Sequence, residues 1–150
     1  MFALLLGVCE MTLSFNNYQS LEPAESGSNA PNRNIPERVK ELRLMDYLTP
    51  GSSVLDVGCN RGYFGIHLSH MVGQYTGVEH SSEIEHGFDK VRERGLSNVK
   101  LVRSRFEEWA QSEEAQTYDV ILLLAVIAYI DWPMERLAEW LEEHLNPGRS

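Results

Sequence analysis

The sequence predicts an α/β fold of the Rossmann-like type, in which a mostly parallel sheet lies between two layers of helices. Short apolar segments alternate with amphipathic helical segments from Pro36 onwards, as in successive βαβ units. The first apolar strand, 53–57, runs into a glycine-rich turn, and the next strand ends in an acidic residue, Glu79. In such sheets ligands bind beyond the carboxyl ends of the strands, so a small-molecule site is expected there.

The expected strands and helices follow one another without an internal repeat. A first helix should begin at Pro36 and end before Pro50-Gly51, because residues at helical spacing between them are apolar: Val39, Leu42, Met45 and Leu48. Strands are expected at 53–57, 75–79, 99–103 and 119–125, and further helices at about 62–71, 82–95 and 133–145.

Local signals refine three of these elements. Ser82 and Glu85 form a candidate capping box for the third helix, and Gly95 should end it. Its apolar face is expected to contain Phe88. The strand 119–125 is almost continuously apolar, which is typical of a central parallel strand buried on both faces.

Composition limits the possible functions. With 150 residues and 43% hydrophobic content, the chain should form a domain with a real core. The net charge of −9 disfavours nucleic-acid binding and leaves a small molecule or a protein as substrate. Cys9 and Cys59 give no disulfide framework, which suits the reducing cytoplasm. The opening apolar run lacks a basic n-region, so neither export nor membrane insertion is expected.

The first part of the chain differs from the rest. Residues 14–34 are rich in Ser, Asn, Pro and Gly, a composition that disfavours a packed core. We therefore expect a flexible N-terminal arm at 1–34 and a folded domain at 35–150.

The glycine-rich turn reads Asp56-Val57-Gly58-Cys59-Asn60-Arg61-Gly62. Glycine and asparagine tolerate left-handed backbone, so this turn can bring its amides close to a ligand. Glu79 lies 23 residues after Asp56, near the interval at which a second strand delivers a carboxylate to a ribose. A nicotinamide-binding fingerprint would instead need glycine at positions 60 and 63. A turn that only packs helix on strand is the simpler alternative.

These motifs resemble those of class I S-adenosylmethionine-dependent methyltransferases, with Asn60 in place of the middle glycine of D-x-G-x-G-x-G. The segments 118–121 and 145–148 also resemble family motifs, so the resemblance covers residues 36–148. It implies a sheet of order 3-2-1-4 that lacks the later strands of the family. Strand four would then be an exposed apolar edge, and we expect a second copy or another chain to cover it, with the N-terminal arm folded back over the edge as the alternative.

The resemblance also bears on the N-terminal arm. In similar methyltransferases the segment before the core often folds over the substrate. It thus implies that Phe15, Tyr18 and Gln19 could form part of a lid, with a disordered leader as the alternative.

The resemblance implies S-adenosylmethionine as the cofactor, with Glu79 accepting the ribose hydroxyls and Asp56 approaching the methionine amino group. Arg105 departs from the family, which often places an acidic residue near the adenine amine. Glu107 could take that role, with a solvated carboxylate at a helix start as the alternative. The implied cofactor-binding residues are Asp56, Gly58, Cys59, Asn60, Gly62, Glu79, His80, Arg105, Phe106 and Ala125.

The acceptor is less well defined by the sequence. After strand four the chain lacks the Asn/Asp-Pro-Pro-aromatic signature of enzymes that methylate nucleic-acid amines, which favours a small-molecule acceptor. Tyr129 and Asp131 are candidate substrate contacts, with a core position and a helix cap as their respective alternatives. His67 and His70 lack a third ligand, so no metal is expected. No catalytic base is assigned, and a non-catalytic cofactor-binding or assembly module remains the alternative.

Overall fold

The computed structural model describes residues 3–7, 19–21, 33–124 and 126–147. Its centre is a parallel sheet in the order β1-β7-β4-β5-β6. The strands of this sheet are β1 (Ala3–Gly7), β4 (Ser53–Val57), β5 (Gln74–Glu79), β6 (Val99–Arg103) and β7 (Val120–Leu124). A second, two-stranded sheet pairs β2 (Gln19–Ser20) with β3 (Arg33–Asn34).

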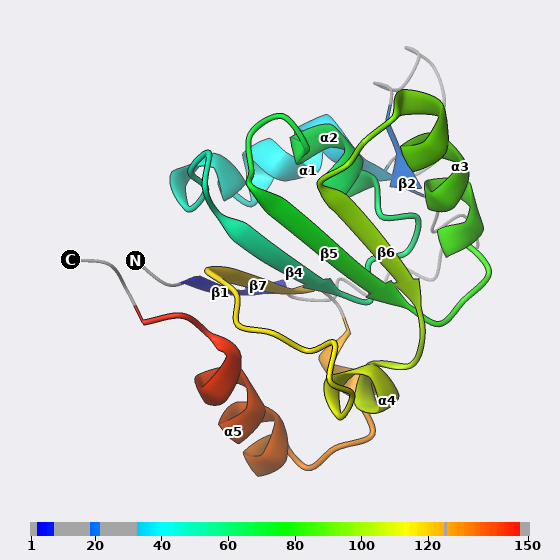
Figure 1. Cartoon of the computed structure of the whole chain (residues 1–150). Coiled ribbons are helices and arrows are strands. Elements are labelled where there is room, and N and C mark those ends of the chain that lie inside the picture. Colours follow the sequence, from blue (N-terminus) through cyan, green and yellow to red (C-terminus); the bar gives the residue numbers. More distant parts are fainter. Residues whose placement is uncertain (1–2, 8–18, 22–32, 125, 148–150) are drawn as a thin grey trace.

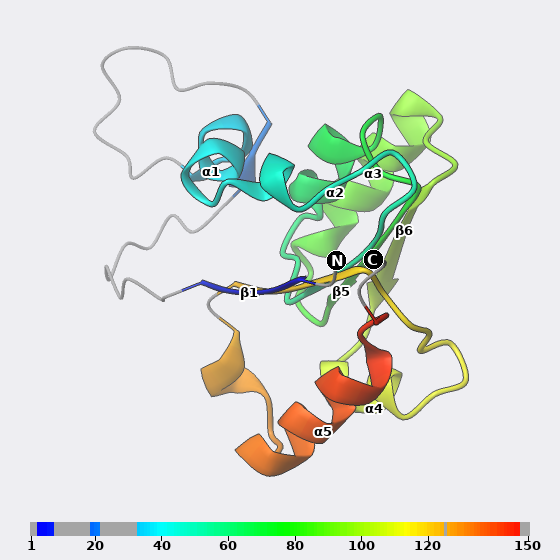
Figure 2. The same cartoon turned by 90° about the vertical axis from the view of Figure 1, so that its left-hand side faces the viewer.

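Helices cover both faces of the large sheet (Figures 1 and 2). One face carries α1 (Ile35–Glu41), α2 (Tyr63–Leu68) and α3 (Ile84–Arg94), and the other carries α4 (Phe106–Ala110) and α5 (Met134–His144). The described residues also form two short 3-10 turns, η1 (Leu44–Asp46) and η2 (Ile127–Tyr129). The predicted Rossmann-like α/β/α architecture and the order 3-2-1-4 are therefore confirmed, with β1 as an additional strand.

Strand β7 is buried on both faces, as its apolar run predicts. Val120 and Leu122 belong to the core cluster beneath α1 and α2, whereas Ile121 and Leu123 belong to the cluster beneath α4 and α5. This alternation follows from the two-residue period of a strand, which sends successive side chains to opposite faces. A strand with two buried faces therefore needs an apolar residue at every position.

The expected exposed edge at strand four is wrong. β1 pairs in parallel with β7 along its whole length, from Ala3 opposite Val120 to Gly7 opposite Leu124. The edge is thus covered within the chain, which removes the reason for expecting a partner chain there. The boundary at residue 34 stays a prediction, although Ala3–Gly7 lies in the sheet. Of the lid candidates, Gln19 starts β2, and Phe15 and Tyr18 lie outside the described residues.

The first helix is shorter than its apolar spacing predicts. It ends at Glu41, and Arg43 adopts a left-handed conformation with φ of 51° before η1 begins. This reversal sends Leu44 into the core, with 1% of its surface exposed, and leaves Met45 48% exposed. Burial of one leucine thus overrides the helical period.

The third helix also departs from prediction at its start and on its apolar face. Glu83 is the N-cap and makes no side-chain capping bond, so the expected Ser82–Glu85 box does not form. Glu85 instead pairs with Arg103 on the neighbouring strand at 2.8 Å. Phe88 is exposed, because Ile84 and Gly87 are the buried residues of this helix. Gly95 ends the helix with φ of 62°, as predicted.

Asp119 joins three segments at the amino ends of the central strands. Its Oδ2 accepts the backbone N–H of Ser53 at 2.9 Å, and its Oδ1 accepts the side-chain N–H of Asn146 at 2.9 Å. The backbone of Tyr118 accepts the N–H of Asn146 at 2.8 Å. The segments 118–121 and 145–147 therefore meet, and they fix the end of α5 to the sheet.

We expect Asp119→Ala to lower the free energy of unfolding by about 2–4 kcal/mol, because a part-buried carboxylate with several donors is lost. Urea unfolding followed by circular dichroism measures this change. Asp89→Ala is the control, since Asp89 pairs with Arg92 on the exposed side of α3. Similar unfolding free energies for the two variants would contradict the structural role of Asp119.

Candidate functional site

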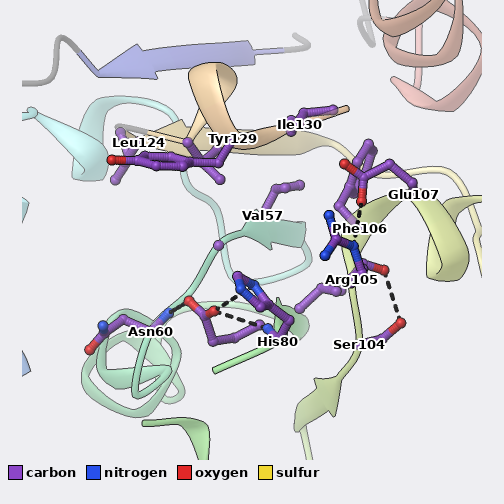
Figure 3. Close-up of a pocket in the computed structure, with 14 residues that line it drawn as sticks. Val57, Asn60, His80, Ser104, Arg105, Phe106, Glu107, Leu124, Tyr129 and Ile130 are labelled. Carbon is purple, nitrogen blue, oxygen red and sulfur yellow. Dashed lines mark hydrogen bonds and ion pairs between the residues drawn. The ribbon is translucent and has the colours of Figure 1, made fainter. Parts of the chain in front are cut away.

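A cleft of about 320 Å³ lies at the carboxyl ends of β4, β5, β6 and β7. Three groups of residues line it: the turn after β4, the residues after β5 and β6, and the segment that follows β7. Figure 3 shows Asn60 and His80 on one side and Leu124 and Tyr129 on the other. The site is therefore where the sequence places it, beyond the strand ends of an open α/β sheet.

The turn after β4 is built from alternating left-handed residues. Gly58, Asn60 and Gly62 have φ angles of 70°, 56° and 74°. The N–H groups of Gly58 and Cys59 donate to the carbonyl of Val78, at 2.8 and 3.1 Å. A side chain on Gly58 would place its Cβ 2.6 Å from Val126. Glycine is thus required where the turn meets the wall that follows β7.

Glu79 connects the turn after β4 to the residues that follow β5. Its side chain is 11% exposed. Oε1 accepts the N–H of Asn60 at 2.9 Å, and Oε2 accepts the N–H groups of His80 and Ser81 at 2.9 and 3.1 Å. The exposed His80 ring adds a contact at 3.4 Å from Nδ1 to Oε2. The carboxylate therefore presents negative charge to the cleft and also fixes the glycine turn.

Asp56 lies beneath the turn and does not line the cleft. It is buried, and its Oδ2 accepts the hydroxyl of Tyr75 at 2.5 Å. Burial raises the pKa of Asp56 to about 7, the Tyr75 hydrogen bond opposes this shift, and the charge of Glu79 adds to it. The sequence gives no sign of this partner beyond the need of a buried tyrosine for a hydrogen bond.

Cys59 and Gly62 also lie outside the cleft lining. The Cys59 thiol packs against Gly77, where an added Cβ would lie 2.8 Å from Sγ. Burial, with the nearby charges of Asp56 and Glu79, raises the pKa of this thiol well above its usual range, so it is a neutral packing group. An added Cβ at Gly62 would lie 2.6 Å from Leu101 of β6, so this glycine lets the turn pack against that strand.

Four consecutive residues, from Ser104 to Glu107, form the wall beyond β6. Glu107 is 15% exposed, and its Oε1 accepts the N–H of Asp131 at 2.6 Å. It is therefore held inside the cleft, and the alternative of a solvated carboxylate is wrong. Arg105 is exposed, with its Nε 3.9 Å from Glu107 Oε2.

Phe106 closes the same end of the cleft with its ring. The ring is buried and packs edge-on against Trp132 and Trp140, with centroids 5.4 and 5.1 Å apart. The last predicted cofactor contact, Ala125, lies outside the described residues.

An apolar wall follows β7, and sequence reasoning found only part of it. It consists of Leu124, Val126, Tyr129 and Ile130. Tyr129 is 74% exposed, so the alternative that places it in the core is wrong. Asp131 does not cap α5, because Pro133 is the N-cap and makes no side-chain bond. The exposure of Tyr129 depends on η2, which no local sequence signal predicts.

Comparisons with known proteins identify the family of the chain. A family profile described as a methyltransferase domain matches residues 30–150. The chain belongs to this family. Among solved structures, coclaurine N-methyltransferase bound to N-methylheliamine and SAH has a TM-score of 0.62 at 24% identity, covering 83% of this chain and 36% of that protein. A SAM-dependent methyltransferase from Aquifex aeolicus has a TM-score of 0.51 at 27% identity, covering 71% and 60%.

One curated methyltransferase shares a segment with the chain. The 23S rRNA (uracil(1939)-C(5))-methyltransferase RlmD of Alcanivorax borkumensis is 33% identical over 90 residues, or 55% of this chain and 19% of RlmD. The chain thus spans about a fifth of RlmD and about a third of coclaurine N-methyltransferase. The resemblance to class I methyltransferases and the Rossmann-like fold are confirmed.

Two properties of the described residues bear on other functions. None of the helices in these segments is both long and apolar enough to cross a membrane. In the same part of the chain, no three His, Cys, Asp or Glu side chains are grouped as metal ligands.

Proposed function

We propose that this methyltransferase domain binds S-adenosylmethionine in the cleft and transfers the methyl group to a small-molecule acceptor. The observation that carries the proposal is the Glu79 carboxylate, which lies at the end of β5 and is bonded to the left-handed turn at Asn60. Two acceptor oxygens on one carboxylate match the vicinal hydroxyls of a ribose. Family membership and the SAH-bound neighbour support the same cofactor.

The chain's residues would act mainly by positioning. Bound S-adenosylmethionine supplies an electrophilic methyl group on a sulfonium. With both bound, the acceptor's lone pair would form the new bond to the methyl carbon as the carbon–sulfur bond breaks, S-adenosylhomocysteine would leave, and any surplus proton would pass to water. Holding the acceptor in line can provide much of the rate enhancement, so a dedicated base is not required. Gly58 lets the turn lie directly against Val126, with no side chain between them.

The wall after β7 suits an acceptor with an apolar surface. The Gly58–Val126 contact makes this wall continuous with the cofactor turn, so an acceptor on it would lie next to the donor. Its described side chains, those of Leu124, Val126, Tyr129 and Ile130, carry no charge. The net charge of −9 favours a small molecule over a polyanion. The buried free thiol of Cys59 fits a reducing compartment, and we place the protein in the cytoplasm.

Calorimetric titration tests the cofactor assignment. S-adenosylmethionine and S-adenosylhomocysteine are expected to bind with one-to-one stoichiometry, and NAD is expected to give no heat. Transfer of a labelled methyl group to a panel of amines, phenols and thiols then tests catalysis. Binding without transfer to any acceptor would favour the non-catalytic module, and binding of NAD alone would overturn the proposal.

Tyr129→Ala is expected to raise KM for the best acceptor of that panel by roughly three- to tenfold, the usual worth of an aromatic contact. The dissociation constant of S-adenosylhomocysteine should stay unchanged, because Tyr129 is exposed on the opposite side of the cleft from His80 (Figure 3). Tyr129→Phe is the control and should retain the wild-type KM. If Tyr129→Ala raised the dissociation constant of S-adenosylhomocysteine as much as KM for the acceptor, Tyr129 would not be a specific acceptor contact.

A further inference from the structure

The glycine turn is a strained element that needs support from its surroundings. Three of the five residues 58–62 have positive φ, and one of the three, Asn60, carries a side chain. A non-glycine residue in this conformation is disfavoured by about 1 kcal/mol or more. Without external contacts, the turn would relax and its amides would lose their arrangement around a ligand.

Three contacts from one neighbouring segment, 79–87, hold the turn. Glu79 accepts the N–H of Asn60 at 2.9 Å. Arg61 Nε donates to Glu83 Oε2 at 2.8 Å. Gly87 of α3 lies directly against the turn, since an added Cβ there would be only 2.0 Å from the carbonyl oxygen of Arg61. The first contact belongs to the cleft, whereas the other two lie outside its lining.

We propose that the Arg61–Glu83 ion pair and Gly87 are positioning elements that hold the turn against α3 and thereby set the affinity for the cofactor. This inference rests on the proposed function, because the affinity concerned is that for S-adenosylmethionine. Glu83 is the N-cap of α3, so the pair fixes Arg61 to the first turn of the helix. Asn60 and Glu79 are thereby kept within hydrogen-bonding distance.

The burial of the pair supports a role beyond a surface contact. The Arg61 and Glu83 side chains are 20% and 24% exposed. The Lys90–Glu93 pair on the same helix is 39% and 60% exposed, and pairs of that kind contribute little because water and salt screen them. Partial burial reduces this screening, and the close approach at Gly87 restricts the turn sterically. The two features act on the same residue, Arg61.

The test compares Glu83→Gln with Glu93→Gln, which makes the same chemical change in the exposed pair. Each variant is titrated calorimetrically with S-adenosylhomocysteine at a temperature well below its melting point. We expect Glu83→Gln to weaken binding roughly three- to tenfold, because its amide still accepts from Arg61 but no longer carries the charge, and Glu93→Gln to bind as the wild type does. Gly87→Ala should weaken binding further if it folds.

Amide hydrogen exchange in the ligand-free protein provides a second readout. The Asn60 N–H, which donates to Glu79, should exchange faster in Glu83→Gln than in the wild type or in Glu93→Gln. This measurement does not depend on the cofactor. If the wild type fails to bind S-adenosylhomocysteine, the proposed function is wrong. The positioning role is then tested by the exchange rate alone. The inference is overturned if the Asn60 N–H in Glu83→Gln exchanges at the wild-type rate. It is also overturned if the wild type binds S-adenosylhomocysteine and Glu83→Gln binds it with the same affinity, even if the melting temperature of the variant falls.

Discussion

Replacement of Glu79 by alanine is expected to weaken binding of S-adenosylhomocysteine by about a hundredfold or more, combining loss of the diol acceptor with release of the turn. The carboxylate accepts three backbone N–H groups, those of Asn60, His80 and Ser81. Removing it leaves these donors without their acceptor and frees the left-handed residue Asn60 to relax. The effect therefore exceeds that of a single hydrogen bond to the ribose.

Calorimetry measures the affinity, and near-ultraviolet circular dichroism checks that the variant is folded. Glu79→Gln should lie between the wild type and alanine, because its amide keeps one acceptor oxygen but loses the charge. Glu85→Ala is the matched control, since Glu85 pairs with Arg103 on the surface. A folded Glu79→Ala protein with a dissociation constant within threefold of the wild type would rule out the ribose assignment.

The stability of the protein is expected to fall as pH rises from about 4 to about 8, through the titration of Asp56. The folded-state pKa of Asp56 is raised from 3.8 to about 7. Between these values the folded state binds more protons than the unfolded state, so folding is favoured at low pH and loses this contribution as pH rises through about 7. The full shift corresponds to a loss of the order of 4 kcal/mol.

Asp56→Asn is expected to remove this component and flatten the pH profile of the unfolding free energy. Tyr75→Phe should make the pH profile steeper. It removes the hydrogen bond that stabilises the charged carboxylate and so raises the pKa of Asp56 further. Urea unfolding at intervals between pH 4 and pH 8 measures both effects. An Asp56→Asn profile with the wild-type slope would show that Asp56 does not titrate in this range.

The strands were the most predictable part of the fold, because their burial depends on local composition. The predicted strands at 53–57 and 99–103 coincide with β4 and β6. A strand that is apolar at successive positions, as β7 is, can be recognised without knowing its neighbours. The conformation of Asn60 could also be predicted from the sequence, because asparagine tolerates the left-handed conformation that the turn requires.

The rest of the fold and site depends on contacts between distant segments. Arg43 adopts a left-handed conformation although its side chain does not favour it, because the reversal buries Leu44. Glu79 could be recognised by its spacing, but its bond to Asn60 required the positions of both segments. Tyr129 is exposed because η2 holds it there, although its apolar neighbours favour a core position. Tertiary packing decides such cases.

The pairing of β1 with β7 has a consequence for how the molecule reaches its folded state. β1 precedes every other described element along the chain, whereas its partner β7 follows all the other strands. During synthesis the segment ALLLG therefore leaves the ribosome long before the strand that it joins. Contacts so far apart in sequence form slowly, and an apolar strand that waits for its partner is open to chaperones and to aggregation. We therefore expect the pairing of β1 with β7 to be a late step of folding.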